Sequence, residues 1–306
     1  MSESSSATMS ISIVIPTLNR GLLLVNTIQD LLAMPSPANE IIVIDQTESQ
    51  PSEVAQQLKN WVQDKSISLA HQTTPSVVKA MNAGLVMAKE DYVLFLDDDI
   101  KPFNNLIEKH WLFAVSHQCD LVAGRVIQPW DDASGIQASH DVGRSFNALD
   151  SCATEHFIGA NFLVKRATAI QVGGFDENFK GTAHNYEREF SDRVRLNEGG
   201  IFYCGDAAVH HLKEPSGGIR AFGHFLKTAK PHHALGAYYY ILRSKRVKQK
   251  GVKILRRLFE RVLTRTHMKA PWWIPVTLLG DILGILWAVA LWLSPPKLLN
   301  RKNSNR

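Results

Sequence analysis

Three consecutive carboxylates, Asp97, Asp98 and Asp99, follow the apolar run YVLFL at residues 92–96. Like charges held this close repel one another unless a cation neutralises them, and a hard divalent ion with oxygen ligands is the usual solution. The first chemical hypothesis is therefore a Mg²⁺ or Mn²⁺ site that holds phosphate oxygens. An acidic triplet can also be a solvated loop, but the apolar run before it favours the end of a buried strand.

A second acidic segment, YEREFSDR, falls within a helix predicted over residues 185–200. In such a helix Glu189 and Arg193 form an i,i+4 pair, so Glu189 is expected to be an ordinary salt-bridge partner. Glu187 is freer to act as a general base, because that role needs a carboxylate within reach of an acceptor hydroxyl.

The strands and helices that would position these side chains are expected to alternate along the first 100 residues. Because ligands bind beyond the carboxyl ends of strands in open α/β sheets, Thr17, Asp45 and the three aspartates should converge on one crevice. Neither the dinucleotide fingerprint nor the Walker pattern occurs in the sequence. The alternation implies βαβ units and a mostly parallel sheet, with strands at 11–16, 40–45, 66–71 and 92–96 and helices at 20–34, 51–62 and 76–90.

The pattern is less regular after residue 120. We expect a strand at 120–128 and two short strands at 201–205 and 207–212. Between them, 129–155 is a long polar loop, which is either a binding loop or lid or a disordered segment. Proline and glycine cluster in KEPSGGIR at 213–220, which favours a boundary there.

The C-terminal third carries the basic surplus of this 306-residue chain, whose formal net charge is +5. A basic amphipathic helix predicted at 253–265 suggests anchoring to anionic lipid, although a solvated helix packed on the rest of the protein is the alternative. The apolar stretch 272–293 contains one charge, Asp281, and is long enough to span a bilayer. A buried core helix and an interfacial or re-entrant segment remain open as well.

Only three cysteines are present, widely spaced, so no disulfide framework is expected and a reducing compartment fits best. We predict five regions in chain order: a flexible leader, an α/β domain, a helical basic region, a transmembrane or membrane-embedded helix and a basic tail, at 1–10, 11–215, 216–270, 271–294 and 295–306.

Six motifs in order over residues 11–212 resemble the family 2 glycosyltransferases, which have the GT-A fold. They are SIVIPTLNR, IIVIDQTES, YVLFLDDD, GANFLVKR, GGFDENF and YEREFSDRVR. The resemblance implies that Thr17 and Asp45 contact the nucleoside of a nucleotide-diphospho-sugar. It also implies that Asp97, Asp98 and Asp99 occupy the family's DXD site.

For the metal, the resemblance implies Asp99 as the foremost ligand, joined by Asp97 and by a histidine at 210 or 211, with His211 preferred. It places Glu187 at the position of the catalytic base. The sequence departs from the family pattern at Gln46, where an acid or Asn is common, and at Tyr186, where Glu is common.

The implied reaction is metal-dependent sugar transfer to an acceptor hydroxyl with inversion of the anomeric configuration. A glycan or lipid-linked acceptor in cell-envelope polysaccharide synthesis, at the cytoplasmic face of the inner or plasma membrane, is the expected setting, and nucleic acid is not an expected partner. Two alternatives stay open: a haloacid-dehalogenase-like phosphatase, which also carries D-x-D after an apolar strand, and a non-catalytic membrane-bound scaffold that binds sugar nucleotide.

Overall fold

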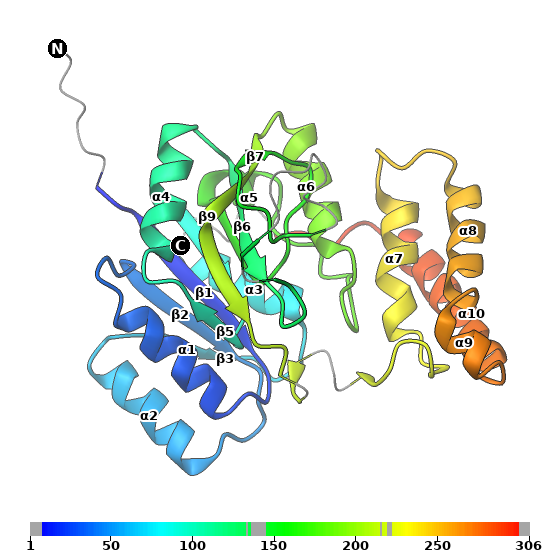
Figure 1. Ribbon diagram of the computed structural model, residues 1–306, viewed down its shortest axis with the longest axis horizontal. Coiled ribbons are helices and arrows are strands. Elements are labelled where there is room, and N and C mark those ends of the chain that lie inside the picture. Colours follow the sequence, from blue (N-terminus) through cyan, green and yellow to red (C-terminus); the bar gives the residue numbers. More distant parts are fainter. Residues whose placement is uncertain (1–7, 133, 136–144, 215, 219–221, 300–306) are drawn as a thin grey trace.

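The protein is described by a computed structural model that covers residues 8–132, 134–135, 145–214, 216–218 and 222–299. It combines a sheet flanked by helices with a group of C-terminal helices at one side (Figure 1). The predicted loop at 129–155 and the predicted boundary at 213–220 lie partly outside the described residues.

The sheet is mixed, with strand order β3-β2-β1-β4-β8-β6-β9-β5 and with β7 also paired to β9. Its first half is parallel: β1 (Ile11–Thr17) lies between β2 (Glu40–Asp45) and β4 (Tyr92–Leu96), and β3 (Ser68–His71) pairs with β2. The second half mixes directions and contains β5 (Ile100–Pro102), β6 (Leu121–Ile127), β7 (Cys152–Ala153), β8 (Asn161–Lys165) and β9 (Ile201–His211).

Side chains that alternate along the strands feed two hydrophobic cores, one on each face of the sheet. On β1, Ile13 and Ile15 face one core while Val14 faces the other. The first core is covered by α1 (Leu22–Leu32), α2 (Ser52–Gln63) and α4 (Leu106–Ser116). The second is covered by α3 (Val77–Met87), α5 (Arg166–Gln171) and α6 (Tyr186–Leu196).

One predicted feature of the sheet is wrong. Residues 201–211 form the single strand β9 rather than two short strands, although its register against β6 shifts between Gly124 and Arg125. The GDA segment in its middle has the composition of a turn, but here the extra residues are absorbed as a bulge that bends the strand without ending it.

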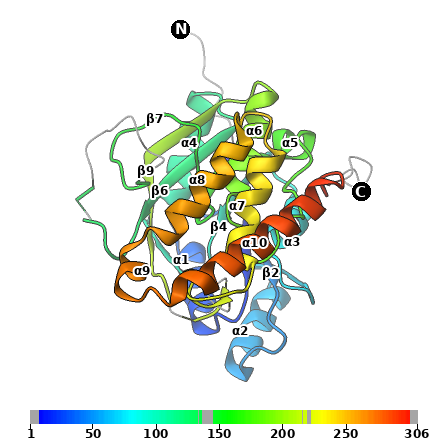
Figure 2. The ribbon, with the colours of Figure 1, turned by 90° about the vertical axis from the view of Figure 1, so that its right-hand side faces the viewer.

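The C-terminal helices are α7 (His232–Arg243), α8 (Lys250–Val262), α9 (Arg265–Lys269) and α10 (Trp273–Trp292), and Figure 2 shows α10 crossing α7 and α8. Residues of α7 such as Leu235 and Tyr239 belong to the same hydrophobic core as Val14. Small residues let α10 approach α7 closely: a Cβ on Gly284 would lie 2.7 Å from Ala234 Cβ.

Candidate active site

The predicted acidic strand end forms a compact group with a histidine from the neighbouring strand. Beyond β4 the chain turns through the three aspartates into β5, whose Ile100 pairs with His211 of β9. His211 Nε2 therefore lies 3.2 Å from Asp99 Oδ1 and 3.5 Å from Asp97 Oδ2. Potential ligand atoms of Asp97, Asp99 and His211 all lie within 4.8 Å of one another.

This group suits a divalent cation. Asp99 and His211 are buried, whereas the Asp97 side chain is 40% exposed. Partial removal of water by the surrounding protein raises the pKa of Asp97 and the Asp99 carboxylate adds to this, while His211, Lys213 and Arg20 oppose it. Two carboxylates match the oxygen preference of Mg²⁺ and Mn²⁺, and an exposed side leaves room for phosphate oxygens. We call Asp97, Asp99 and His211 the metal triad.

Asp98 points to a different partner, Arg20, which the sequence analysis did not single out. Arg20 Nε lies 2.9 Å from Asp98 Oδ1, Nη2 lies 3.2 Å from Asp99 Oδ2, and Nη1 donates to the Ser216 carbonyl at 2.6 Å. Burial nevertheless raises the pKa of Asp98 to about 7. Arg20 thus offsets part of the acidic charge and ties the segment after β9 to the site. Its position at the end of the first motif, PTLNR, was the available signal.

Thr17 and Asp45 lie side by side, as predicted, because β1 and β2 are parallel and these two residues are paired in register. The Asp45 carboxylate accepts hydrogen bonds from the Thr47 backbone N–H and from Gln50 Nε2, both at 2.9 Å. Both strand ends are buried. This corner of the crevice therefore carries a fixed, hydrogen-bonded carboxylate.

Gln46, the departure from the family pattern next to Asp45, organises the loop before α3. Its Oε1 accepts from the Ser76 backbone N–H at 2.6 Å and from Gln72 Nε2 at 3.0 Å, and its Nε2 donates to the Thr17 carbonyl. An amide can both donate and accept at this position, which a carboxylate cannot.

Glu187 lies in the first turn of α6, against the loop that leads into β8. A Cβ on Gly159 in that loop would fall 2.1 Å from Tyr186 Oη and 3.6 Å from Glu187 Oε1, so the close approach requires glycine. Burial raises the pKa of Glu187 to about 7, opposed by its own backbone N–H and that of Gly159, while Asp97 adds repulsion. Glu187 and the metal triad thus interact electrostatically.

The neighbouring acids and histidines have different surroundings. Glu189 forms the expected ion pair with Arg193 at 2.7 Å. His210 stacks on Phe103 with ring centroids 5.2 Å apart, and it is not a member of the metal triad. A cavity of about 350 Å³ opens beside His210 and His211, within the range of small-ligand sites.

Comparison with known proteins points in one direction. The profile of Glycosyl transferase family 2 matches residues 12–175, more than half of the chain. The pre-mycofactocin glycosyltransferase of Mycobacterium tuberculosis (strain ATCC 25618 / H37Rv) is 30% identical over 120 residues, which cover 36% of this chain and 25% of that protein. The poly(ribitol-phosphate) beta-N-acetylglucosaminyltransferase TarP of Staphylococcus aureus (strain N315) is 27% identical over 117 residues, covering 38% and 36%. The matched stretches thus span about a third or less of these relatives.

Solved structures with similar folds cover nearly the whole chain. The mannosyltransferase PcManGT from Pyrobaculum calidifontis, in complex with GDP-Man and Mn²⁺, has a TM-score of 0.58 at 18% identity, covering 93% of this chain and 78% of its own. S. aureus TarS 1–349 in complex with UDP-GlcNAc has a TM-score of 0.61 at 16% identity, covering 93% and 81%. These likenesses confirm the predicted fold class.

Proposed function

Since the chain belongs to glycosyl transferase family 2 and has the GT-A fold, we propose that it moves a sugar from a nucleotide-diphospho-sugar to an acceptor hydroxyl. The observation that carries this proposal is the meeting, at one edge of the sheet, of the metal triad with the carboxylate of Glu187. Displacement of a diphosphate by a hydroxyl needs a cation beside the leaving diphosphate and a base that takes the proton of the hydroxyl. A cation-binding group beside a carboxylate whose pKa is about 7 can supply both.

For the donor, we propose that Thr17 and Asp45 contact the nucleoside and that Asp97 and Asp98 lie against the ribose and diphosphate. Mg²⁺ or Mn²⁺ would be held by the metal triad and would neutralise negative charge on the leaving diphosphate. PcManGT binds GDP-Man and Mn²⁺ in its structure, and TarS 1–349 binds UDP-GlcNAc. These complexes support a nucleotide-diphospho-sugar as the proposed donor.

For the chemical step, we propose that Glu187 is the general base. Its carboxylate accepts the proton of the acceptor hydroxyl as the hydroxyl oxygen attacks the anomeric carbon from the face opposite the diphosphate. One displacement of this kind inverts the anomeric configuration. A base with a pKa near 7 is well matched to neutral pH, because enough of it is ionised while it retains affinity for the proton.

Membership of the family argues against the phosphatase alternative and leaves the scaffold alternative to experiment. Asp99→Asn keeps the size of the side chain and removes one charged ligand. We expect wild-type protein to gain thermal stability with a guanosine, uridine or thymidine sugar nucleotide when Mn²⁺ or Mg²⁺ is present, and the variant to lose most of this gain. If no sugar nucleotide protects the wild-type protein in the presence of either metal, the donor site is not where we place it.

Attachment to a membrane is a second part of the proposal. Among the described residues, one helix, α10, is long and apolar enough to cross a bilayer, a property that a core helix of a soluble protein can share. Hydrogen bonds near the start of α10 and beyond its end tie both sides of this helix to the rest of the protein. Thr277 Oγ1 donates to the Leu226 carbonyl at 2.8 Å, and beyond α10 the Leu299 backbone N–H donates to the Gly173 carbonyl at 2.8 Å.

These two anchors favour a helix that lies in the membrane interface over one that spans the bilayer, because spanning would break at least one of them. The outer sides of α8 and α10 carry apolar side chains that water would otherwise surround; Phe259 is 64% and Leu286 is 62% exposed. Exposed residues Val252, Leu255, Phe259 and Leu263 form one stripe along α8. With the Lys and Arg residues around it, this stripe suits the interface of an anionic bilayer.

We therefore propose that the enzyme works on the cytoplasmic face of an inner or plasma membrane, on a lipid-linked glycan of the cell envelope. The free cysteines Cys119, Cys152 and Cys204 agree with a reducing compartment.

A further inference from the structure

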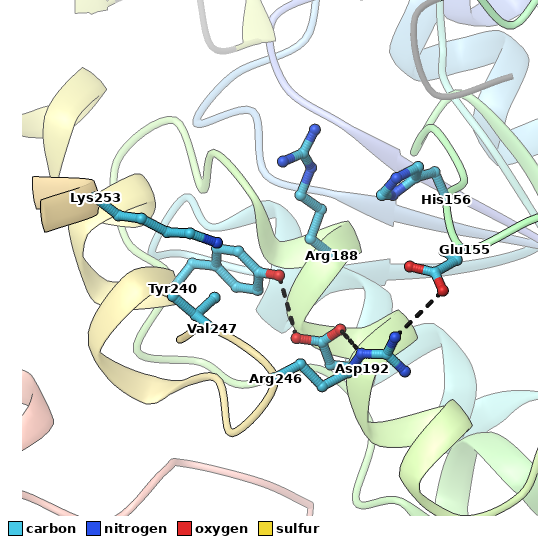
Figure 3. A pocket seen from close by; sticks show the side chains of 8 residues that line it. All are labelled: Glu155, His156, Arg188, Asp192, Tyr240, Arg246, Val247 and Lys253. Atoms are coloured by element: carbon cyan, nitrogen blue, oxygen red, sulfur yellow. Dashed lines mark hydrogen bonds and ion pairs between the residues drawn. The ribbon is translucent and has the colours of Figure 1, made fainter. Parts of the chain in front are cut away.

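A small cavity of about 180 Å³ lies at the seam between the sheet-bearing part of the chain and its C-terminal helices. Figure 3 shows side chains from α6, α7, α8, the loop between α7 and α8, and the loop before β8 around it. Its volume is below the usual range for whole small-molecule ligands and equals the share of about six water molecules in the liquid. It can hold one compact polar group, not a nucleotide.

The acidic residues at this cavity already have partners. Asp192 accepts a hydrogen bond from Tyr240 Oη at 3.2 Å and lies 3.5 Å from Arg246 Nε. Glu155 pairs with Arg246 Nη2 at 3.2 Å and also with Arg195. Figure 3 shows the contacts that run from Tyr240 through Asp192 and Arg246 to Glu155 along one side of the cavity. The carboxylates are therefore engaged by Arg246, Arg195 and a phenol.

Two cations at the cavity lack such partners. In the described part of the chain, the side chains of Arg188 and Lys253 form no ion pair and no hydrogen bond; both line this space and both are exposed to solvent. They come from α6 and α8, and in Figure 3 Lys253 extends across Tyr240 toward α6, from which Arg188 rises. Two unpaired positive groups brought to one cavity from distant segments favour an anion there.

The cavity adjoins the proposed catalytic base. Arg188 follows Glu187 in α6, and Glu155 belongs to the same loop as Gly159, against which Glu187 packs. The charge of Arg188 favours ionised Glu187, whereas that of Asp97 opposes it, so Glu187 interacts with both the cavity and the metal triad. A molecule whose hydroxyl reaches Glu187 on the side away from the donor diphosphate would extend toward Arg188.

We propose that the cavity bounded by Arg188 and Lys253 binds a phosphate group of the acceptor, which is thereby identified as a phosphate-bearing molecule. This inference rests on the proposed sugar transfer. The Arg188 guanidinium offers paired N–H donors that match phosphate oxygens, and Lys253 supplies a second charge from the helix that carries the apolar stripe. The same chemistry is offered by a lipid phosphate and by a soluble polyol phosphate.

The test is binding to the full chain of geranyl phosphate and glycerol phosphate, with geraniol and glycerol as uncharged counterparts, followed by ³¹P NMR and calorimetry. We expect Arg188→Gln and Lys253→Gln each to weaken binding of both phosphates about tenfold or more, because hydrogen bonds to charged groups contribute about 1.5–3 kcal/mol. Arg256→Gln is the matched control: it removes one positive charge from α8 at an exposed residue paired with Glu260, and it should leave binding unchanged.

Tighter binding of geranyl phosphate than of glycerol phosphate, with the same loss in the variants, supports the site and identifies a lipid phosphate. Equal affinities support the site and identify a polyol phosphate. The proposal is overturned if the double variant binds both phosphates as the wild type does, if Arg256→Gln weakens binding as much, or if geraniol binds as tightly as geranyl phosphate.

Donor binding, measured in the same samples by Mn²⁺-dependent thermal protection, separates this proposal from the proposed function. Loss of phosphate binding with donor protection intact supports a separate acceptor site. Loss of both shows that the cavity is part of the donor site and overturns the acceptor assignment. Wild-type protein that binds phosphate here but no sugar nucleotide contradicts sugar transfer, and the acceptor role with it.

Discussion

Two regions of this molecule bury acidic side chains, and they neutralise them differently. At the end of β4, the charges of three aspartates are only partly offset by Arg20, His211 and Lys213. In the C-terminal helices the fully buried Asp281 accepts from Tyr238 Oη at 2.8 Å and pairs with Arg261 at 3.0 Å. A buried charge with matched partners serves packing, whereas a group left short of positive charge is suited to bind a cation.

The test with the largest expected effect removes the proposed base, Glu187, which lies beside the three aspartates. We expect Glu187→Gln to lower the rate of sugar transfer by about 10²–10⁴-fold, because the amide cannot take the proton from the acceptor hydroxyl. Transfer is measured with a donor that protects the protein thermally.

Thermal protection by that donor should persist in the Glu187→Gln variant, which serves as its folding control. Transfer at the wild-type rate would show that another group is the base, and absence of transfer in the wild type as well would favour the scaffold alternative.

The second test addresses the buried ion pair between Asp281 and Arg261. We expect Asp281→Asn to lower the free energy of unfolding by about 3–5 kcal/mol, because Arg261 would be left buried without a counter-charge. Glu260→Gln is the control, since its pair with Arg256 is exposed and contributes about 0–1 kcal/mol. Chemical denaturation gives both values.

Equal losses for these two variants would mean that the Asp281 pair is as well hydrated as a surface pair. The double variant Arg261→Met, Asp281→Leu sharpens the result: it should recover much of the stability, because an apolar pair of similar volume replaces the charges.

The contrast between the two regions also explains what the sequence could predict. Strand and helix positions in residues 11–96 agree with the structure because short apolar runs and amphipathic runs alternate there clearly. The parallel order then brings Thr17 beside Asp45 without further information. The pairing of β5 with β9, which delivers His211 to the aspartates, is a contact between distant segments. Periodicity did not predict this pairing, and only the family resemblance pointed to His211 as a ligand.

Other features depend on side-chain contacts that no local pattern encodes. The Arg20–Asp98 ion pair joins residues 78 positions apart. The cavity at Arg188 and Lys253 draws on two loops and three helices. The apolar face predicted for the helix at 253–265 divides in the structure, with Leu258 packed against a core and Phe259 exposed, because the positions of α7 and α10 decide which side is covered.

The third test concerns the outer face of the C-terminal helices. We expect Leu255→Glu and Phe259→Glu each to reduce partition into vesicles containing anionic lipid about tenfold, since each removes an apolar side chain whose full burial contributes about 1.5–3 kcal/mol. Leu22→Glu on α1 is the control, because Leu22 is comparably exposed at 53% on a helix of the sheet-bearing part.

Cysteines placed at Lys269 and Ser294, before and after α10, distinguish an interfacial helix from a spanning one. An impermeant maleimide added outside the vesicles should label both positions above the background of the native thiols. Protection of one of the two would show that α10 spans the bilayer and that its anchors to Leu226 or Gly173 open.

The last expected effect is a pH dependence of transfer that belongs to the acidic region alone. Burial raises the pKa of Glu187 to about 7, so the residue is ionised above that pH and protonated below it. A base must be ionised, so transfer should fall about tenfold for each pH unit below 7 and level off above it. The apparent rate constant at saturating donor and acceptor is measured from pH 5.5 to 8.5.

Asp98 has a similarly raised pKa, so donor affinity is followed in parallel. A fall in rate at constant donor affinity assigns the profile to Glu187. A rate that is level from pH 5.5 to 8.5 would mean that bound donor and cation return the Glu187 pKa to its ordinary range, and that the under-neutralised state is a property of the empty site only.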